Sequence, residues 1–192
     1  MRVALLLFSL LLAGCGPSYK HPPGSLQLDE PKQTNLKDGP TWEIDDYKLV
    51  GLATFELEAL VILRATFGSG SGREADLSPL DLTLAWGPAA DSAFLRKINF
   101  RHSGRFYYYD WKDPGVDGSL LGSHTANMHM IPADASVADQ LMAVERDDIV
   151  TLKGHLVRVD GEDGWHWQSS MTRKDSGAGS CELVRVTTIG IQ

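Results

Sequence analysis

The longest regular pattern of apolar and polar positions runs from Thr54 to Phe67. Apolar side chains occupy every second position there, and glutamate, arginine and threonine fill several of the positions between them. A period of two predicts a strand with one buried face. The central Leu-Glu-Ala-Leu, residues 57–60, would also suit a helix. The apolar positions are Phe55, Leu57, Ala59, Val61, Leu63, Ala65 and Phe67.

Shorter segments rich in branched and aromatic residues predict further strands. They cover residues 80–86, 105–111, 149–159, 165–170 and 182–189, and Asp160–Gly164 reads as a hairpin loop. Helical spacing predicts short helices over residues 91–97 and 135–144. The expected fold is therefore mainly β, a small barrel or sandwich with one or two short helices.

Residues 147–189 resemble the later strands of small OB-fold barrels. The segment Asp148-Ile-Val-Thr-Leu-Lys-Gly154-His-Leu-Val begins a strand that, in such barrels, curls at its glycine. The resemblance covers about a quarter of the chain, and SH3-like barrels use similar patterns. It implies an OB-like architecture in the C-terminal part, with strand edges removed by closure.

The N-terminus has the features of an export signal. Arg2 precedes an apolar run from Val3 to Leu12, which is too short to span a bilayer as a helix. Leu12-Ala13-Gly14-Cys15 resembles the lipobox of bacterial lipoproteins. The resemblance implies removal of residues 1–14 as a signal peptide and attachment of diacylglycerol and a fatty acid such as palmitate at Cys15. By resemblance to lipoproteins of Gram-negative bacteria, Gly16 rather than aspartate after Cys15 implies the outer membrane. The expected location is the cell envelope, on the periplasmic side, although the residues do not determine which leaflet the protein faces.

Residues 15–41 are expected to form a flexible tether, and residues 42–192 a single β-rich domain. Proline recurs through the first segment, at positions 17, 22, 23, 31 and 40, and excludes a long helix. Order is expected to begin near Trp42.

The charge of the chain disfavours nucleic-acid partners, and its cysteine content disfavours an intramolecular disulfide. Loss of Arg2 with the signal leaves 17 basic and 25 acidic residues, a net charge of −8. An acidic chain without a dense basic stripe is a poor candidate for nucleic-acid binding, so no such partner is expected. With Cys15 acylated, Cys181 has no partner for an intramolecular disulfide, and burial as a small apolar residue is the favoured interpretation.

Three segments also resemble an uncharacterised bacterial family of exported or membrane-attached proteins. They are Asn127-Met-His-Met-Ile-Pro132, Gly164-Trp-His-Trp-Gln-Ser-Ser170 and Arg173-Lys-Asp-Ser-Gly-Ala-Gly-Ser-Cys-Glu182. The resemblance implies a common fold and no known activity.

The segment from His124 to His129 holds the first candidate site. On a strand, Asn127 and His129 would share one face and His124 the other. These side chains could bind zinc, but zinc needs three or four ligands and the nearby sequence completes no such set. Hydrogen-bonded structural roles are the favoured alternative, and no cofactor is predicted.

Ser176 holds a second candidate site. Asp175-Ser176-Gly177 is similar to the nucleophile segment of chymotrypsin-like proteases, and His129, Asp147 or Asp148, and Ser176 follow that family's chain order. Lys174 and Ala178 replace glycines of that segment, and Asp-Ser-Gly is also ordinary turn chemistry.

Aromatic pairs and a glycine-rich loop are the candidate binding elements. Trp165 and Trp167 would share a strand face, as would Tyr107 and Tyr109. Such faces can stack on sugars, although filling the core is the favoured interpretation. The loop from residue 173 to 182 offers charged side chains for a ligand or for an internal ion pair: Arg173, Asp175 and Glu182.

Two hypotheses follow from these residues. The first is a lipid-anchored binding or structural module that recognises an envelope protein or glycan. The second is an envelope hydrolase, metal-dependent or serine-based, which uses the segment from His124 to His129. The hydrolase requires this segment and the loop from Arg173 to Glu182 to converge, whereas a binding module would show an exposed aromatic face and scattered histidines.

Overall fold

The computed structural model describes residues 18–172, 177 and 179–192. Strands account for 47% of the described residues and helices for 16%, so the mainly β prediction is confirmed. The helices are all short, and there are more of them than the sequence predicted. Within the described ranges, no helix combines the length and apolar character that crossing a membrane would need.

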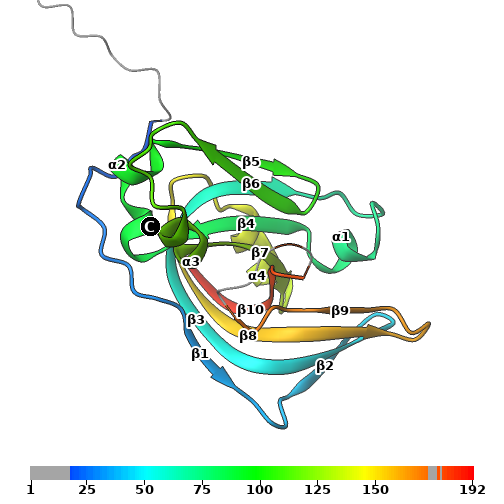
Figure 1. The fold of residues 1–192 in the computed structure, drawn as a ribbon. Coiled ribbons are helices and arrows are strands. Elements are labelled where there is room, and N and C mark those ends of the chain that lie inside the picture. The colour runs from blue at the N-terminus through cyan, green and yellow to red at the C-terminus, as the bar shows by residue number, and fades with distance from the viewer. Residues whose placement is uncertain (1–17, 173–176, 178) are drawn as a thin grey trace, which may run out of the picture.

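Five strands close into a small barrel (Figure 1). Their order around it is β3 (Tyr47–Thr66), β4 (Leu80–Ala85), β7 (Thr125–Pro132), β10 (Glu182–Ile191) and β8 (Ile149–Gly161), and β8 pairs again with β3. Neighbours are antiparallel except for β7 and β10, and helix α4 (Ala135–Met142) connects β7 to β8. This is the arrangement of an OB-type barrel, and it includes β3, β4 and β7 as well as the C-terminal strands.

Closure depends on the length and bend of β3. Residues 47–60 of this strand pair with β8, and residues 60–66 pair with β4. The register shifts between Gly51 and Ala53 and between Val61 and Leu63, as expected where a strand bends. The alternation predicted for 54–67 therefore holds up to Ala59, whereas residues 59–62 are all buried at the bend.

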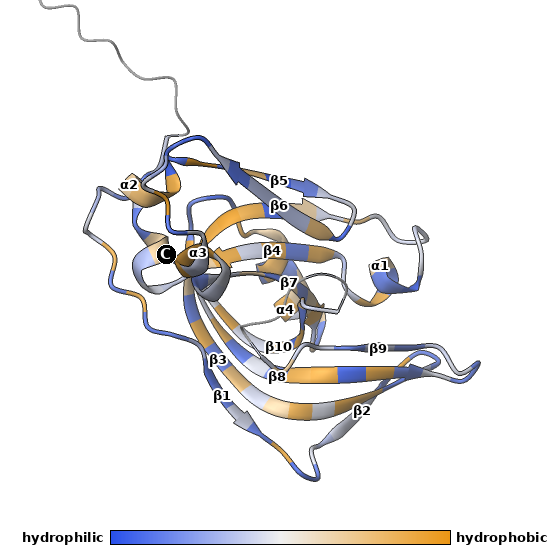
Figure 2. Cartoon of the chain, in the orientation of Figure 1, coloured by the Kyte–Doolittle hydropathy of each residue, from blue (hydrophilic) through white to orange (hydrophobic). Residues whose placement is uncertain are grey.

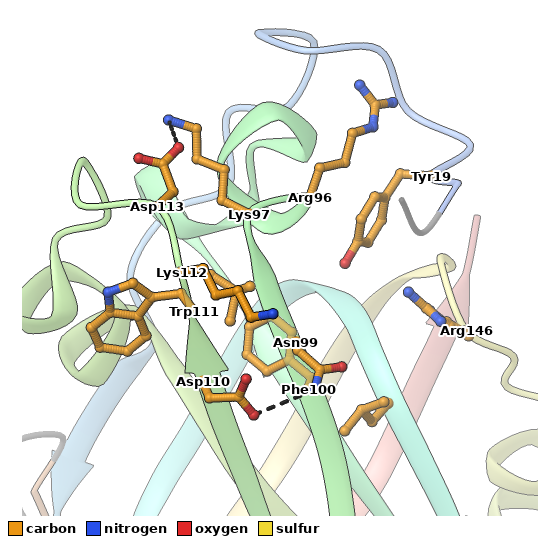
Figure 3. A pocket seen from close by; sticks show the side chains of 12 residues that line it. Tyr19, Arg96, Lys97, Asn99, Phe100, Asp110, Trp111, Lys112, Asp113 and Arg146 are labelled. Atoms are coloured by element: carbon orange, nitrogen blue, oxygen red, sulfur yellow. Dashed lines mark hydrogen bonds and ion pairs between the residues drawn. The ribbon is translucent and has the colours of Figure 1, made fainter. Parts of the chain in front are cut away.

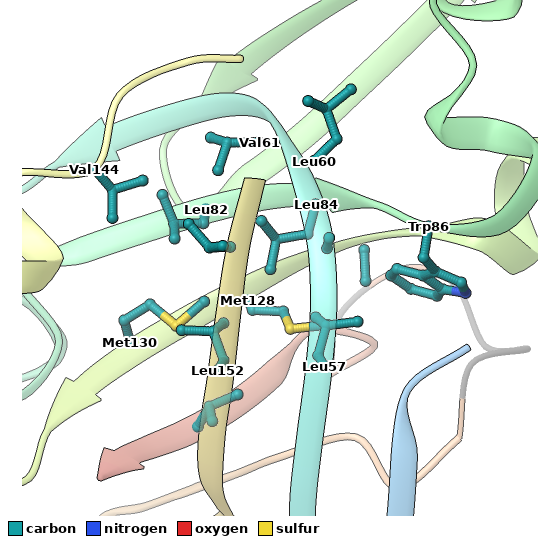
Figure 4. Packing of buried hydrophobic residues seen from close by; sticks show 14 of the residues in the cluster. Leu57, Leu60, Val61, Leu82, Leu84, Trp86, Met128, Met130, Val144 and Leu152 are labelled. Atoms are coloured by element: carbon teal, nitrogen blue, oxygen red, sulfur yellow. The ribbon is translucent and has the colours of Figure 1, made fainter. Parts of the chain in front are cut away.

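The barrel interior is filled by buried apolar side chains that form one cluster (Figure 4). Leu57 and Val61 of β3 meet leucines of β4 and β8 and methionines of β7, while Val144 lies just beyond α4. Trp86 closes the interior near the end of β4. Alternate positions on each strand point inward, so the opposite positions of β4, β7 and β10 are left to form an outer face.

The segment before Trp42 differs from the predicted tether. Tyr19 and Leu28 are buried in the core, β1 (Lys32–Asn35) and β2 (Thr41–Ile44) pair with β3, and Lys20 forms an ion pair with Asp148. From residue 18 onward this segment therefore packs on the barrel. Proline excluded a helix there, but it did not exclude extended chain along a strand that has an open edge.

A second apolar cluster lies outside the barrel, beneath β2 and β9 (His166–Gln168). Leu49, Val157 and Leu183 form part of it, and Trp165 and Trp167 pack against it. Helix α1 (Arg73–Leu77), in the connection from β3 to β4, adds Leu77. Figure 2 shows the resulting mixture of apolar and polar positions along the outer strands.

A long insertion joins β4 to β7. It contains a 3-10 turn (Gly87–Ala90), α2 (Ser92–Leu95), the hairpin of β5 (Ile98–Ser103) and β6 (Phe106–Trp111), and α3 (Gly118–His124). Asp91 caps α2 by accepting hydrogen bonds from Ala93 N and Phe94 N. The sequence predicted β6 and the α2 region but not β5, whose apolar content is low. The hairpin forms a separate two-stranded sheet beside the barrel (Figure 1).

Gly154 should be essential for the closure of the barrel. A Cβ at this position would lie 2.1 Å from the backbone oxygen of Arg185 on the paired strand β10. We expect Gly154→Ala to lower the free energy of unfolding in urea by about 2 kcal/mol or more, because the clash is with backbone. Gly190→Ala is the matched control, since its Cβ would meet only Thr151 at 3.9 Å. Equal midpoints for the two variants would contradict the close-approach argument.

Candidate functional site

A charged cluster lies on the outer face of the barrel, at the tip of the β5–β6 hairpin. Arg105 lies in the hairpin turn. It donates from Nη1 to Asp81 Oδ1 on β4 over 2.8 Å, and from Nη2 to the carbonyl oxygen of Ser78 over 2.8 Å. His129 Nδ1 on β7 lies 2.9 Å from the same Asp81 oxygen, but the angle between the two groups is unsuitable for a hydrogen bond. The turn itself is permitted by Gly104, whose φ is +58°.

Aromatic rings enclose this guanidinium. The Arg105 guanidinium carbon lies 3.9 Å from the centre of the Phe67 ring and 5.5 Å from that of Trp167. Trp167 also packs on the His129 ring, with 4.9 Å between ring centres. Phe67 comes from the β3–β4 connection and Trp167 from β9, so the Arg105 cluster joins five separate parts of the chain. We use this name for Phe67, Asp81, Arg105, His129 and Trp167.

The cluster is nearly sealed from solvent. The Asp81 side chain is fully buried and that of Arg105 is 17% exposed. Burial lowers the pKa of Arg105, and the Asp81 carboxylate opposes that shift. A buried ion pair contributes little net stability relative to apolar residues, but removal of one partner leaves an uncompensated charge. The pair therefore holds the hairpin tip in one position on the barrel.

A second polar group continues the cluster beneath the hairpin. Thr83 Oγ1 on β4 lies 2.7 Å from His102 Nε2 and donates to Asn127 Oδ1 over 3.2 Å, and Asn127 Nδ2 donates to the carbonyl oxygen of Arg105. Burial lowers the pKa of His102 and raises that of Tyr107 to about 12. These contacts fix the inner face of the hairpin along its length.

The predicted histidine segment divides between two places. Asn127 and His129 share the outer face of β7, whereas His124 ends α3 and contacts Ser123, Leu120 and, at 3.8 Å, the Glu30 carboxylate. His155 packs against Trp42, and His166 is exposed. Within the described part of the chain, no group of three or more His, Cys, Asp or Glu could hold a metal ion.

The predicted binding loop is described only at its end. Arg173, Asp175 and Ser176 lie outside the described residues. Cys181 Sγ is 4.0 Å from Asn127 Nδ2, and Glu182 is buried at the start of β10. The C-terminal end of the loop therefore meets Asn127. Cys181 itself is half-buried, less than its apolar neighbours led us to expect.

The two predicted tryptophans line the outer apolar cluster. Trp165 lies 6.4 Å from Trp167 and 5.6 Å from Tyr47 between ring centres. Arg73 of α1 stacks over Trp165 and donates to Asp163 of the β8–β9 turn, so it links the β3–β4 and β8–β9 connections. Both tryptophans are half-buried.

The opposite face of the hairpin is open. Phe106 and Tyr108 of β6 are 42% and 44% exposed, and Arg101 of β5 stacks over Tyr108 and pairs with Asp110 at 2.7 Å. Tyr107 and Tyr109, the predicted aromatic pair, instead point toward the barrel, where Tyr107 Oη lies 3.1 Å from Thr125 Oγ1. The exposed aromatic pair is therefore Phe106 and Tyr108, not the predicted pair of Tyr107 and Tyr109.

Sequence reasoning did not identify Asp81, Thr83 and Arg105. A signal was present, because Asp81 interrupts a predicted strand between two leucines, where aspartate is disfavoured. Its partner could not be identified, since Arg105 is 24 residues away and reaches it only through a hairpin that the sequence showed in part.

Comparisons with protein-family models, curated proteins and solved structures give no match for this chain.

Removing Arg105 should destabilise the fold strongly. Arg105→Gln leaves Asp81 buried without its cation, and we expect a loss of about 3 kcal/mol in the free energy of unfolding. Arg101→Gln is the matched control on the same hairpin; both partners of that ion pair are more than half exposed, and the cost should stay below about 1 kcal/mol. The double variant Asp81→Asn/Arg105→Gln should lose less than the sum of its single variants. Equal losses for the two arginine variants would contradict the argument.

His102 should make stability depend on pH. Its folded pKa is lowered by burial, so the folded state binds fewer protons than the unfolded state near the ordinary histidine pKa of about 6.5. The free energy of unfolding should therefore be unaffected by His102 above about pH 6.5, and it should decrease as the pH falls from about 6.5 toward the lower folded pKa. His102→Gln should reduce this slope in urea unfolding between pH 8 and pH 5. Exposed His166→Gln should leave it unchanged, and an unaltered slope in His102→Gln would count against the assignment.

Proposed function

We propose that this chain is a lipid-anchored binding module of the bacterial cell envelope, held at the outer membrane through Cys15. Support comes from the lipobox-like sequence at residues 12–15 and from the dispersal of the histidines in the structure. The observation that carries the proposal is the exposed aromatic pair, Phe106 and Tyr108, on a hairpin fixed in place by Arg105.

The outer face of the β5–β6 hairpin has the composition of a binding surface. Aromatic residues and arginine are enriched at the centres of protein interfaces, and isolated exposed aromatics on a rigid strand contribute contact area at little entropic cost. Arg101 and Asp110 supply polar groups beside the rings. In the part of the chain that the structure describes, no further strand pairs with β5 or β6, so a partner strand could add to the hairpin edge. We therefore favour a protein partner over a glycan.

The alternative is a hydrolase that uses His129, and one observation favours it: the 2.9 Å approach of His129 to Asp81. However, His129 is only 4% exposed and its ring is covered by Trp167. A general base must reach a substrate proton directly or through one water molecule. Bound zinc at near one ion per chain, lost in His129→Ala, would support the hydrolase and count against the binding module.

Photo-crosslinking from the hairpin face tests the proposal in cells. A photoreactive phenylalanine analogue at Tyr108 or Phe106 preserves the aromatic ring, and we expect a discrete crosslinked product with an envelope protein. Ile191 is the control position, because it is a comparably exposed apolar residue on β10 rather than on the hairpin. The same protein with Cys15→Ala should leave the membrane fraction.

Two outcomes would contradict the proposal. The absence of a crosslinked product at both hairpin positions would contradict the assignment of this face as a binding surface. Retention of the Cys15→Ala variant in the membrane fraction would contradict the assignment of Cys15 as the lipid anchor.

A further inference from the structure

A pocket of about 510 Å³ lies at the opposite end of the hairpin from the Arg105 cluster. It is bounded by the N-terminal segment at Tyr19, the end of α2, the base of the β5–β6 hairpin and the loop that carries Arg146 (Figure 3). Its volume is that of a small-molecule site. None of its residues belongs to the Arg105 cluster or to the exposed aromatic pair.

The pocket is cationic within an acidic protein. Four of its residues are basic, and two are acidic: Arg96, Lys97, Lys112, Arg146, Asp110 and Asp113. Lys97 pairs with Asp113 at 3.2 Å, and Asp110 pairs with Arg101 outside the pocket at 2.7 Å. Among the residues described, Arg96, Lys112 and Arg146 form no ion pair. The local charge is therefore positive, although the predicted mature chain carries −8.

Tyr19 supplies a buried donor to the same space. Its side chain is more than nine-tenths buried, yet its hydroxyl has no hydrogen-bond partner within the described chain. Burial raises the pKa of Tyr19, so the hydroxyl keeps its proton at neutral pH. Figure 3 shows the hydroxyl and the ends of Lys112 and Arg146 directed toward one region, whereas Arg96 extends away from it.

The donor set fits a phosphate group. A guanidinium, an ammonium and a phenol hydroxyl can all donate hydrogen bonds, and bonds from the two cations to the charged oxygens of a phosphate are charge-assisted and therefore strong. Leu63, Phe100 and Trp111 line the pocket beside these donors and offer apolar contact to the part of a ligand that adjoins the phosphate. An amphiphilic phosphodiester satisfies both parts of the lining.

The position of Tyr19 in the chain suggests where such a ligand would be found. Tyr19 follows Cys15 by four residues, and four extended residues span at most about 14 Å. An acylated Cys15 would hold Tyr19 within that distance of the membrane surface. We propose that the Tyr19–Lys112–Arg146 pocket binds the phosphate of an anionic phospholipid headgroup, an inference that rests on the proposed lipid anchor for its membrane location.

Binding of a soluble lipid tests the pocket independently of the anchor. The full chain carrying Cys15→Ser is titrated with dihexanoyl phosphatidylglycerol below its micelle concentration, and tryptophan fluorescence reports on Trp111. We expect saturable binding that weakens about tenfold or more in Lys112→Gln/Arg146→Gln, and less in Tyr19→Phe. Lys153→Gln/Arg158→Gln removes the same charge elsewhere on the protein and should bind like the parent chain.

Inorganic phosphate and dihexanoyl phosphatidylcholine separate the sources of the phosphate. Phosphate that binds as tightly as the anionic lipid would make this a free-phosphate site and overturn the headgroup assignment. Equal binding of phosphatidylcholine, or equal losses in both double variants, would overturn the anionic site. If the proposed lipid anchor is wrong, the wild-type chain will carry no acyl group, but its binding of the soluble lipid will be unchanged.

Discussion

Closure of the barrel by β3 is the constraint on which the rest of the structure depends. One strand of 20 residues must bend enough to pair with both β4 and β8. Two register shifts accompany the bend of β3, and the close approach of β10 to β8 at Gly154 completes the closed barrel. With the interior filled by apolar side chains, the polar residues of β4 and β7 can only point outward. The Arg105 cluster is therefore a consequence of barrel closure, since Asp81 and His129 are the outward positions of adjacent strands.

The buried ion pair between Asp81 and Arg105 fixes the position of the hairpin tip and adds little net stability to the fold. A leucine and a methionine at these sites would bury without the cost of desolvating two charges. A guanidinium between Phe67 and Trp167, however, has one acceptable orientation, because its edge must reach Asp81 and the Ser78 carbonyl oxygen. This side chain fixes the tip of the hairpin on the barrel, and the contacts of His102 and Asn127 continue along its inner face. A backbone held in this way lowers the entropic cost of binding to the exposed aromatic face.

The sequence predicted what local periodicity encodes. Alternation from residue 54 to 67 identified most of β3, and branched residues from 149 to 159 identified β8. Asn127 and His129 were placed on one face by the same period. What the sequence left out depends on tertiary pairing: β1 and β2 exist because β3 offers an edge, and Asp81 gains its role from a residue 24 positions away. His124 was grouped with His129 by proximity in sequence, but the end of α3 separates them.

Both proposals use the same hairpin, and its geometry links them. Asp110 and Trp111 line the pocket near Tyr19, whereas Phe106 begins β6 beside the Arg105 cluster. Six residues of strand span about 20 Å, so β6 extends from the pocket to the Arg105 cluster. A ligand in the pocket and a partner on the aromatic pair would therefore contact different ends of one hairpin.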